Sequence, residues 1–141
     1  MSESTEEWLL MVDGAARGNP GEAGCGAVIV DERGRTVREL SRYLGRTTNN
    51  VAEYHGLLMG LDALLKMGRR NVRIQSDSEL LVRQLTGRYR VRDEKLKPLF
   101  ARAIELLGQL DSYRIVHVPR EMNKPADRLA NRGVDKGRKH R

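Results

Sequence analysis

Short apolar runs in the first third of the chain predict three β-strands. Residues 8–12 (WLLMV) are all apolar and too few for a helix, so they favour a central strand that is buried on both faces. The run CGAVIV at residues 25–30 predicts a second strand, which the turn DERG at 31–34 connects to a third strand at 36–43. The glycine-rich residues 14–24 between the first two strands predict a loop.

Helical spacing begins after residue 50. Apolar residues recur every three to four positions over 51–65 and predict an amphipathic helix, and a strand is expected at 71–75. Ser76 and Glu79 then fit a capping box, with the serine as N-cap, at the start of a short helix. The remaining predicted elements are a helix over about 93–107, a strand over 113–118 and a final helix from about residue 123.

The predicted order is three strands, a helix, a strand, two helices, a strand and a helix. A meander followed by alternating strands and helices predicts an α/β fold, in which a mixed sheet carries helices on its faces. The chain of 141 residues is long enough for one hydrophobic core. We expect one domain over residues 1–135 and a basic, disordered tail at 136–141.

Four acidic residues stand at the ends of predicted elements. Asp13 follows the first apolar run, and Asp77 lies at a junction between a strand and a helix. Glu53 and Asp127 fall in the first turns of two helices, at the margin of the apolar face. A turn or the helix dipole explains each acid equally well when it is taken alone. Together they predict a shared site, because carboxylates that converge in a small volume require cations.

The type of ligand indicates which cations such a site would bind. Oxygen ligands suit Mg²⁺ or Mn²⁺, and the chain has no cluster of cysteine and histidine typical of a zinc site. Two divalent ions about 4 Å apart can hold the attacking water and the leaving oxygen of a phosphodiester. We therefore expect two Mg²⁺ ions, with Mn²⁺ as an alternative, at a site for phosphodiester hydrolysis.

Polar residues in two segments are candidate contacts for a nucleic acid. Asn19 lies at the tip of the glycine-rich loop, where the backbone can approach a ligand closely. In the next segment, Arg46, Thr48 and the amides of the following helix could hold a phosphate. Asn49 and Asn50 could reach the edges of bases in a minor groove. One residue of this segment is also needed to cap the helix.

Charge and cysteine content narrow the class of protein further. The formal net charge of +7 and the pI of about 10.0 suggest a polyanionic partner, nucleic acid first, but the charge by itself also fits solubility alone. The single Cys25 excludes an internal disulfide and fits a reducing compartment. The N-terminus lacks the features of a signal peptide, and no apolar stretch reaches membrane-spanning length. We expect a cytoplasmic monomer with no membrane anchor and no disulfide-linked partner.

Four motifs, in this order along the chain, resemble the type 1 ribonuclease H (ribonuclease HI) family. They are DG followed by GNPG at 13–21, RTTNN and a later acid at 46–53, SDS at 76–78, and NKPADRLA at 123–130. The resemblance covers about residues 9–135. It implies a five-stranded mixed sheet whose second strand is antiparallel to the rest. It also implies hydrolysis of the RNA strand of RNA–DNA hybrids with two Mg²⁺ ions, which leaves 3′-hydroxyl and 5′-phosphate ends.

The resemblance assigns roles to the candidate residues. The family's four metal-binding carboxylates match Asp13, Glu53, Asp77 and Asp127. Its substrate-binding residues are a loop asparagine, two minor-groove asparagines and a pocket for a DNA phosphate, and they match Asn19, Asn49, Asn50, Arg46 and Thr48.

The chain departs from the family pattern in two places. Many members carry a histidine in a mobile loop just before the last catalytic helix, but residues 119–123 (PREMN) are few and contain none. His117 is expected to be packed within a strand. Some members also have a basic protrusion between the middle helices, which this chain lacks. The cations of residues 88–92 (RYRVR) fit either a solvated face or contact with a nucleic-acid backbone.

Two other functions stay open at this point. A binding module of the same fold would bind the hybrid without hydrolysing it. A nuclease of the same fold could act on double-stranded RNA or on DNA instead. Asn49, Asn50 and the phosphate pocket favour the hybrid.

Overall fold

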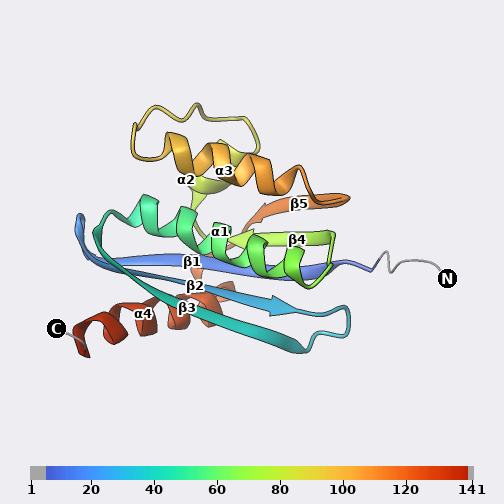
Figure 1. Ribbon diagram of the computed structural model, residues 1–141, viewed down its shortest axis with the longest axis horizontal. Helices are drawn as coiled ribbons and strands as arrows, with labels where there is room; N and C mark the ends of the chain where they lie inside the picture. Colours follow the sequence, from blue (N-terminus) through green and yellow to red (C-terminus); the bar gives the residue numbers. More distant parts are fainter. Residues whose placement is uncertain (1–5, 140–141) are drawn as a thin grey trace.

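The computed structural model describes residues 6–139, which form a five-stranded sheet with helices on both faces (Figure 1). The strands lie in the order β3-β2-β1-β4-β5. Strand β2 is antiparallel to both neighbours, whereas β4 is parallel to β1 and β5 is parallel to β4. This arrangement confirms the expected α/β fold with an antiparallel second strand. The strands are β1 (Trp8–Gly18), β2 (Gly21–Val30), β3 (Thr36–Thr47), β4 (Asn71–Ser76) and β5 (Ser112–His117).

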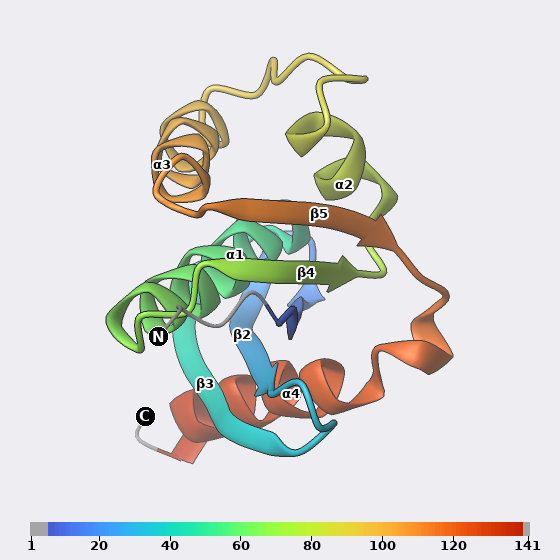
Figure 2. The same cartoon turned by 90° about the vertical axis from the view of Figure 1, so that its right-hand side faces the viewer.

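The helices cover the sheet from two sides. Helix α1 lies against one face and α4 against the other, while α2 and α3 sit on the side of α1, beyond β5 (Figures 1 and 2). They are α1 (Asn49–Lys66), α2 (Glu79–Leu85), α3 (Lys97–Leu107) and α4 (Lys124–Lys139), with the 3₁₀ turn η1 (Arg120–Met122) before α4. In the part of the chain that the structure describes, no helix combines the length and apolarity needed to cross a membrane.

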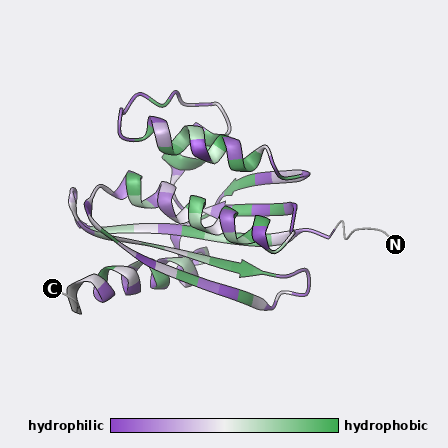
Figure 3. Cartoon of the chain, viewed as in Figure 1, coloured by the Kyte–Doolittle hydropathy of each residue, from purple (hydrophilic) through white to green (hydrophobic). Residues whose placement is uncertain are grey.

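Two hydrophobic layers hold these elements together. The larger lies between the sheet and α1 and α3, and it includes the fully buried Leu10, Leu57 and Ile74. The smaller lies under α4, where Val28 and Leu129 are buried. Strand β2 is buried along most of its length and β3 is mostly exposed, and Figure 3 shows β2 as hydrophobic and β3 as largely hydrophilic.

The predicted glycine loop after residue 12 is wrong, because β1 continues to Gly18 and β2 begins at Gly21. Close packing of helices explains the small residues. A Cβ on Gly14 would lie 2.3 Å from the backbone of α1 at Ala52, and one on Gly26 would lie 2.5 Å from the carbonyl oxygen of Ala126 in α4. These glycines therefore allow the two helices to approach the sheet backbone closely.

The starts of two helices also differ from the prediction. Ser78, not Ser76, is the N-cap of α2, and its hydroxyl accepts a hydrogen bond from the backbone N–H of Leu81. Ser76 instead accepts from the N–H of Ser78 and sets the turn that precedes the helix. Helix α3 begins at Lys97, because residues 93–96 form a turn closed by the side chain of Asp93.

The predicted disorder at 136–141 is wrong for residues 136–139, which are the last turn of α4. Val134 is fully buried, and Gly137 lies so close to the ring of Tyr43 that no side chain would fit there. This packing against β3 holds the end of the helix in place. Residues 140 and 141 lie outside the described part of the chain, so the basic tail is a prediction only there.

Candidate active site

A polar cleft opens where β4 ends beside the longer β1. The two strands pair in parallel as far as Met11 and Gln75, and β4 ends at Ser76. Asp77 follows directly, and Asp13 lies two residues beyond the last pair on β1. The cleft has a volume of about 470 Å³ and receives side chains from β1, α1, α4, η1 and the turn before α2.

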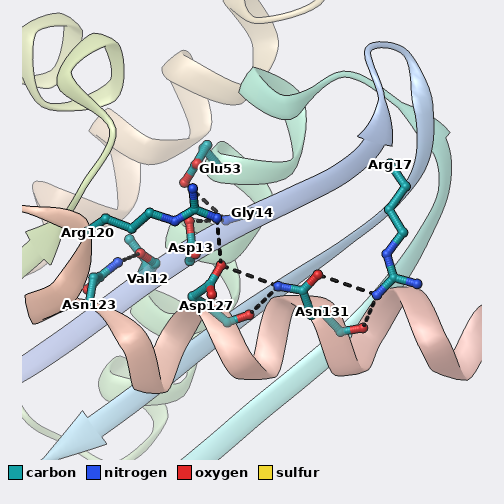
Figure 4. A network of polar contacts seen from close by, with 9 residues as sticks. All are labelled: Val12, Asp13, Gly14, Arg17, Glu53, Arg120, Asn123, Asp127 and Asn131. Carbon is teal, nitrogen blue, oxygen red and sulfur yellow. Dashed lines mark hydrogen bonds and ion pairs between the residues drawn. The ribbon is translucent and has the colours of Figure 1, made fainter.

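The structure brings the predicted acids together in this cleft. Asp13, Glu53 and Asp77 each offer a carboxylate oxygen within 4.8 Å of the others. The backbone N–H of Gly14 donates to Oδ1 of Asp13 at 2.9 Å and to Oε2 of Glu53 at 3.1 Å, so one amide holds two of these carboxylates. Asp127, in the first turn of α4, lines the same cleft, with its side chain 29% exposed. Asp13 comes from β1, Glu53 from α1 and Asp127 from α4 (Figure 4), and Asp77 comes from the turn between β4 and α2.

Crowding and burial change the acidity of this cluster. Burial, followed by the charge of Asp77 and by contact with Asp127, raises the pKa of Asp13 to about 8. Burial and the charges of Asp13 and Asp77 also raise the pKa of Glu53 well above its usual value. Burial raises the pKa of Asp77, although Arg120 opposes that change. The cleft therefore disfavours a full set of negative charges without a counter-ion.

The donor set fits divalent metal ions of the hard type. All the candidate ligands are carboxylates, and three of them are near enough to share one ion. A bound cation would favour the ionised carboxylates, which burial disfavours in all three acids and mutual repulsion disfavours further in Asp13 and Glu53. The geometry of Asp13, Glu53 and Asp77 therefore suits a shared divalent metal ion, and Asp127 lies beside these three acids.

Two further residues of the cleft were not predicted from the sequence. Nη2 of Arg120, on η1, lies 4.0 Å from Oδ1 of Asp127, and the Arg120 side chain reaches toward that acid in Figure 4. Asn131, one helical turn after Asp127, donates to its carboxylate at 3.3 Å. The spacing of four residues between Asp127 and Asn131 was the one available signal for this pair. Arg120 lies in the segment before α4, where the family resemblance leads one to expect a histidine and not an arginine.

The predicted substrate contacts lie in or near the first turn of α1, and Asn49 is the one of them that lines the cleft. Oδ1 of Asn19, in the turn between β1 and β2, accepts a hydrogen bond from the backbone N–H of Asn49 at 3.1 Å. Asn49 lines the cleft, and Asn50 beside it is exposed. Thr48 is the N-cap of α1 and accepts from the N–H of the third residue along, so it is the capping residue that the sequence required. Arg46 is exposed near the end of β3.

His117 and the cations of residues 88–92 lie outside this cleft. His117 is exposed at the end of β5, contrary to the expected packing, and its Nε2 lies 3.3 Å from the carbonyl oxygen of Asp77. The side chains of Arg88, Arg90 and Arg92 are exposed on the segment between α2 and α3. That segment, including Tyr89, lines a separate pocket of about 680 Å³.

Comparison with known proteins places this arrangement in a family. The family model described as reverse transcriptase-like matches residues 11–133. The chain is 44% identical over 123 residues to ribonuclease HI of Halobacterium salinarum. This aligned region covers 87% of this chain and 62% of that protein. The chain belongs to the ribonuclease H family. The first and last of the four acids both lie within the matched residues.

Two solved ribonuclease H structures agree with this assignment. The N-terminal RNase H domain of Rv2228c from Mycobacterium tuberculosis, a fusion with maltose binding protein, superposes with a TM-score of 0.91 at 39% identity and covers 96% of this chain and 98% of that one. LC11-RNase H1 in complex with an RNA/DNA hybrid superposes with a TM-score of 0.88 at 43% identity. The superposition covers 93% of this chain and 99% of that one. The chain spans only 35% of the whole Rv2228c protein, described as bifunctional, over a 128-residue match.

Proposed function

We propose that this protein is a metal-dependent endoribonuclease that cleaves the RNA strand of RNA–DNA hybrids and leaves 3′-hydroxyl and 5′-phosphate ends. The convergence of Asp13, Glu53 and Asp77 within 4.8 Å, with Asp127 in the same cleft, carries this proposal. The complex of LC11-RNase H1 with an RNA/DNA hybrid supports the choice of substrate, since that enzyme shares the fold at 43% identity.

The four carboxylates would hold two Mg²⁺ ions, for which Mn²⁺ could substitute. When bound, such ions activate the attacking water and stabilise the leaving oxygen of the phosphodiester. In this proposal Asp13 and Asp77 would hold both ions, Glu53 would bind the ion on the substrate side, and Asp127 would bind the ion on the side of the nucleophile. The N–H of Gly14 fixes the orientation of Asp13 and Glu53, so these two side chains need little rearrangement when a metal enters.

The polar residues around α1 would bind the two strands of the substrate. Asn19, Asn49 and Asn50 would face the minor groove, where the 2′-hydroxyl distinguishes RNA from DNA. Arg46 and Thr48 would hold a phosphate of the DNA strand, assisted by the N-terminal end of α1. The bond between Asn19 and the N–H of Asn49 supports this proposal, because it fixes the asparagines of two segments relative to each other.

Arg120 would lie beside the reacting phosphate in the segment where many relatives carry a histidine. Its side chain is 79% exposed and approaches Asp127, so it can move toward a phosphate when a metal occupies the carboxylates. We further propose that the protein is a cytoplasmic monomer. The fully buried Cys25, whose pKa burial raises to about 12, is compatible with this because it offers no thiol to a partner.

One cleavage assay tests the proposed activity and its rivals together. Labelled RNA–DNA hybrid, double-stranded RNA and double-stranded DNA are each incubated with Mg²⁺, Mn²⁺ or a chelator. We expect the RNA strand of the hybrid to be cut with either metal and to stay intact with the chelator. A hybrid that is bound but never cut would identify a binding module, and cleavage of double-stranded RNA or DNA in preference to the hybrid would refute the substrate.

A further inference from the structure

A chain of polar contacts connects the carboxylate of Asp127 to Arg17, near the end of β1 (Figure 4). Nδ2 of Asn131 donates to the backbone carbonyl oxygen of Asp127 at 3.0 Å and to its Oδ1 at 3.3 Å. Oδ1 of Asn131 accepts from Nη2 of Arg17 at 3.4 Å. Nη1 of Arg17 also pairs with Asp135, one turn further along α4, at 2.8 Å.

The chemistry of these groups fixes which way the amide of Asn131 points. Arg17 can only donate hydrogen bonds, so the oxygen of the amide must face it. The NH₂ group of Asn131 must then face Asp127, whose carboxylate can only accept when it is ionised. The ion pair with Asp135 keeps Arg17 in place on α4. A different orientation of the amide would set two donors, or two acceptors, against each other.

Asp127 needs such support more than the other acids of the cleft. Asp13 and Glu53 share the backbone N–H of Gly14, which is part of a rigid strand. Asp127 has no such backbone donor in the described residues, and its side chain is partly open to water. A carboxylate on an exposed rim samples several rotamers, and when a metal binds it is restricted to one of them, which costs conformational entropy.

We propose that Asn131 is a positioning residue that holds the carboxylate of Asp127 ready for a metal ion, and that Arg17 acts through Asn131 by fixing its amide. Arg17 belongs to β1 just before the turn that carries Asn19. The end of β1 is thus tied to α4 through Arg17, and the turn that follows it is tied to α1 through Asn19; these are the helices that carry Asp127 and Glu53. This inference rests on the proposed metal site, but not on the identity of the nucleic acid.

Metal affinity without substrate gives the first test. The Mg²⁺ concentration that produces half of the metal-induced rise in unfolding temperature is measured for the wild type, Asn131→Ala and Arg17→Ala. We expect this midpoint to rise about tenfold in Asn131→Ala, a typical effect of losing a hydrogen bond to a metal ligand, and about two- to threefold in Arg17→Ala. Arg132→Ala, which removes an exposed cation next to Asn131 on the same helix, should leave the midpoint unchanged.

A double variant tests whether Arg17 acts through Asn131. Arg17→Ala combined with Asn131→Ala should have the same midpoint as Asn131→Ala alone, since the arginine has nothing left to orient.

Cleavage kinetics and the outcomes of the single variants complete the test. In cleavage assays of Asn131→Ala, the KM for the hybrid should stay within twofold of the wild type while kcat at limiting Mg²⁺ falls. Should Asn131→Ala fail to fold, Arg17→Ala still decides the matter, because the Arg17 side chain is on the surface. An unchanged midpoint in the folded single variants, or additive effects in the double variant, would overturn the proposal. A wild type that binds Mg²⁺ as expected but cuts no hybrid would refute the proposed function alone.

Discussion

Replacing Asp13 with asparagine is expected to reduce cleavage of an RNA–DNA hybrid by about a thousandfold or more at saturating Mg²⁺. Asp13 is the central acid of the cluster: it is 4% exposed, shares a backbone donor with Glu53, and lies close to both Asp77 and Asp127. An amide in its place is neutral and is a poor ligand for Mg²⁺. Single-turnover rates with an end-labelled hybrid measure the loss.

The same substitution is expected to stabilise the protein when no metal is present. Because the pKa of Asp13 is raised from about 3.8 to about 8 in the fold, its protonated form contributes stability at low pH that is lost as the pH rises through this interval. Above pH 8 the ionised carboxylate is a net cost that the asparagine avoids. We expect Asp13→Asn to be more stable than the wild type in chelator by on the order of 2 kcal/mol at pH 8.5, and by less at pH 5.

Asp62→Asn is the matched control, because Asp62 is an acid of α1 that lies outside the cleft, with a half-exposed side chain that pairs with Lys66. Its rate and its stability in chelator should stay close to those of the wild type. Mg²⁺ should raise the unfolding temperature of the wild type and of this control, but much less that of Asp13→Asn. Undiminished Mg²⁺-dependent cleavage by a folded Asp13→Asn variant would refute the central role given to this acid.

Replacing Gly26 with alanine is expected to destabilise the fold by about 3 kcal/mol and to impair activity as well. The added Cβ would lie 2.5 Å from the carbonyl oxygen of Ala126 and 2.6 Å from the backbone nitrogen of Ala130. Both are backbone atoms of α4, so the whole helix must move away from the sheet. That helix carries Asp127, and its displacement would separate the fourth acid from the other three.

Gly108→Ala distinguishes this packing effect from a general effect of glycine replacement. Gly108 follows α3 with a helical φ of −65°, and a Cβ there would meet its nearest atoms at 3.4 Å or more. We expect that variant to unfold within about 0.5 kcal/mol of the wild type, or to be slightly more stable. Chemical denaturation measures both variants, and a Gly26→Ala variant as stable as Gly108→Ala would show that α4 does not lie as close to β2 as described.

The four acids could be predicted from the sequence because each stands where one pattern of hydrophobic residues gives way to another. Asp127 lies in the first turn of α4 and Asp77 lies between a strand and a helix, so their positions follow from local rules. Glu53 was predicted in the first turn of its helix, but it lies deeper in α1 because that helix begins at Asn49. Asp13 was placed correctly for an incomplete reason. The apolar run ends there, but the strand continues to Gly18 because it stays paired with β2, and Gly14 is small because it lies beneath α1.

The features that sequence analysis missed depend on how distant segments meet. Glycine is equally compatible with a flexible loop and with a strand under a closely packed helix, and only the packing of α1 and α4 decides between them. The contact between Arg17 and Asn131 joins residues 114 positions apart, which no local pattern shows. Ser78 replaced Ser76 as the N-cap of α2 because β4 extends one residue further than its apolar pattern suggested.

The location of bound metal is the most direct test of the account. Crystals of the wild-type protein soaked in Mn²⁺ and measured at the manganese absorption edge would locate every ordered ion by its anomalous signal. We expect the strongest peak to lie between the carboxylates of Asp13, Glu53 and Asp77, and to be absent in Asp13→Asn crystals. Manganese bound only elsewhere on the protein, with this cleft left without a peak at saturating Mn²⁺, would contradict it.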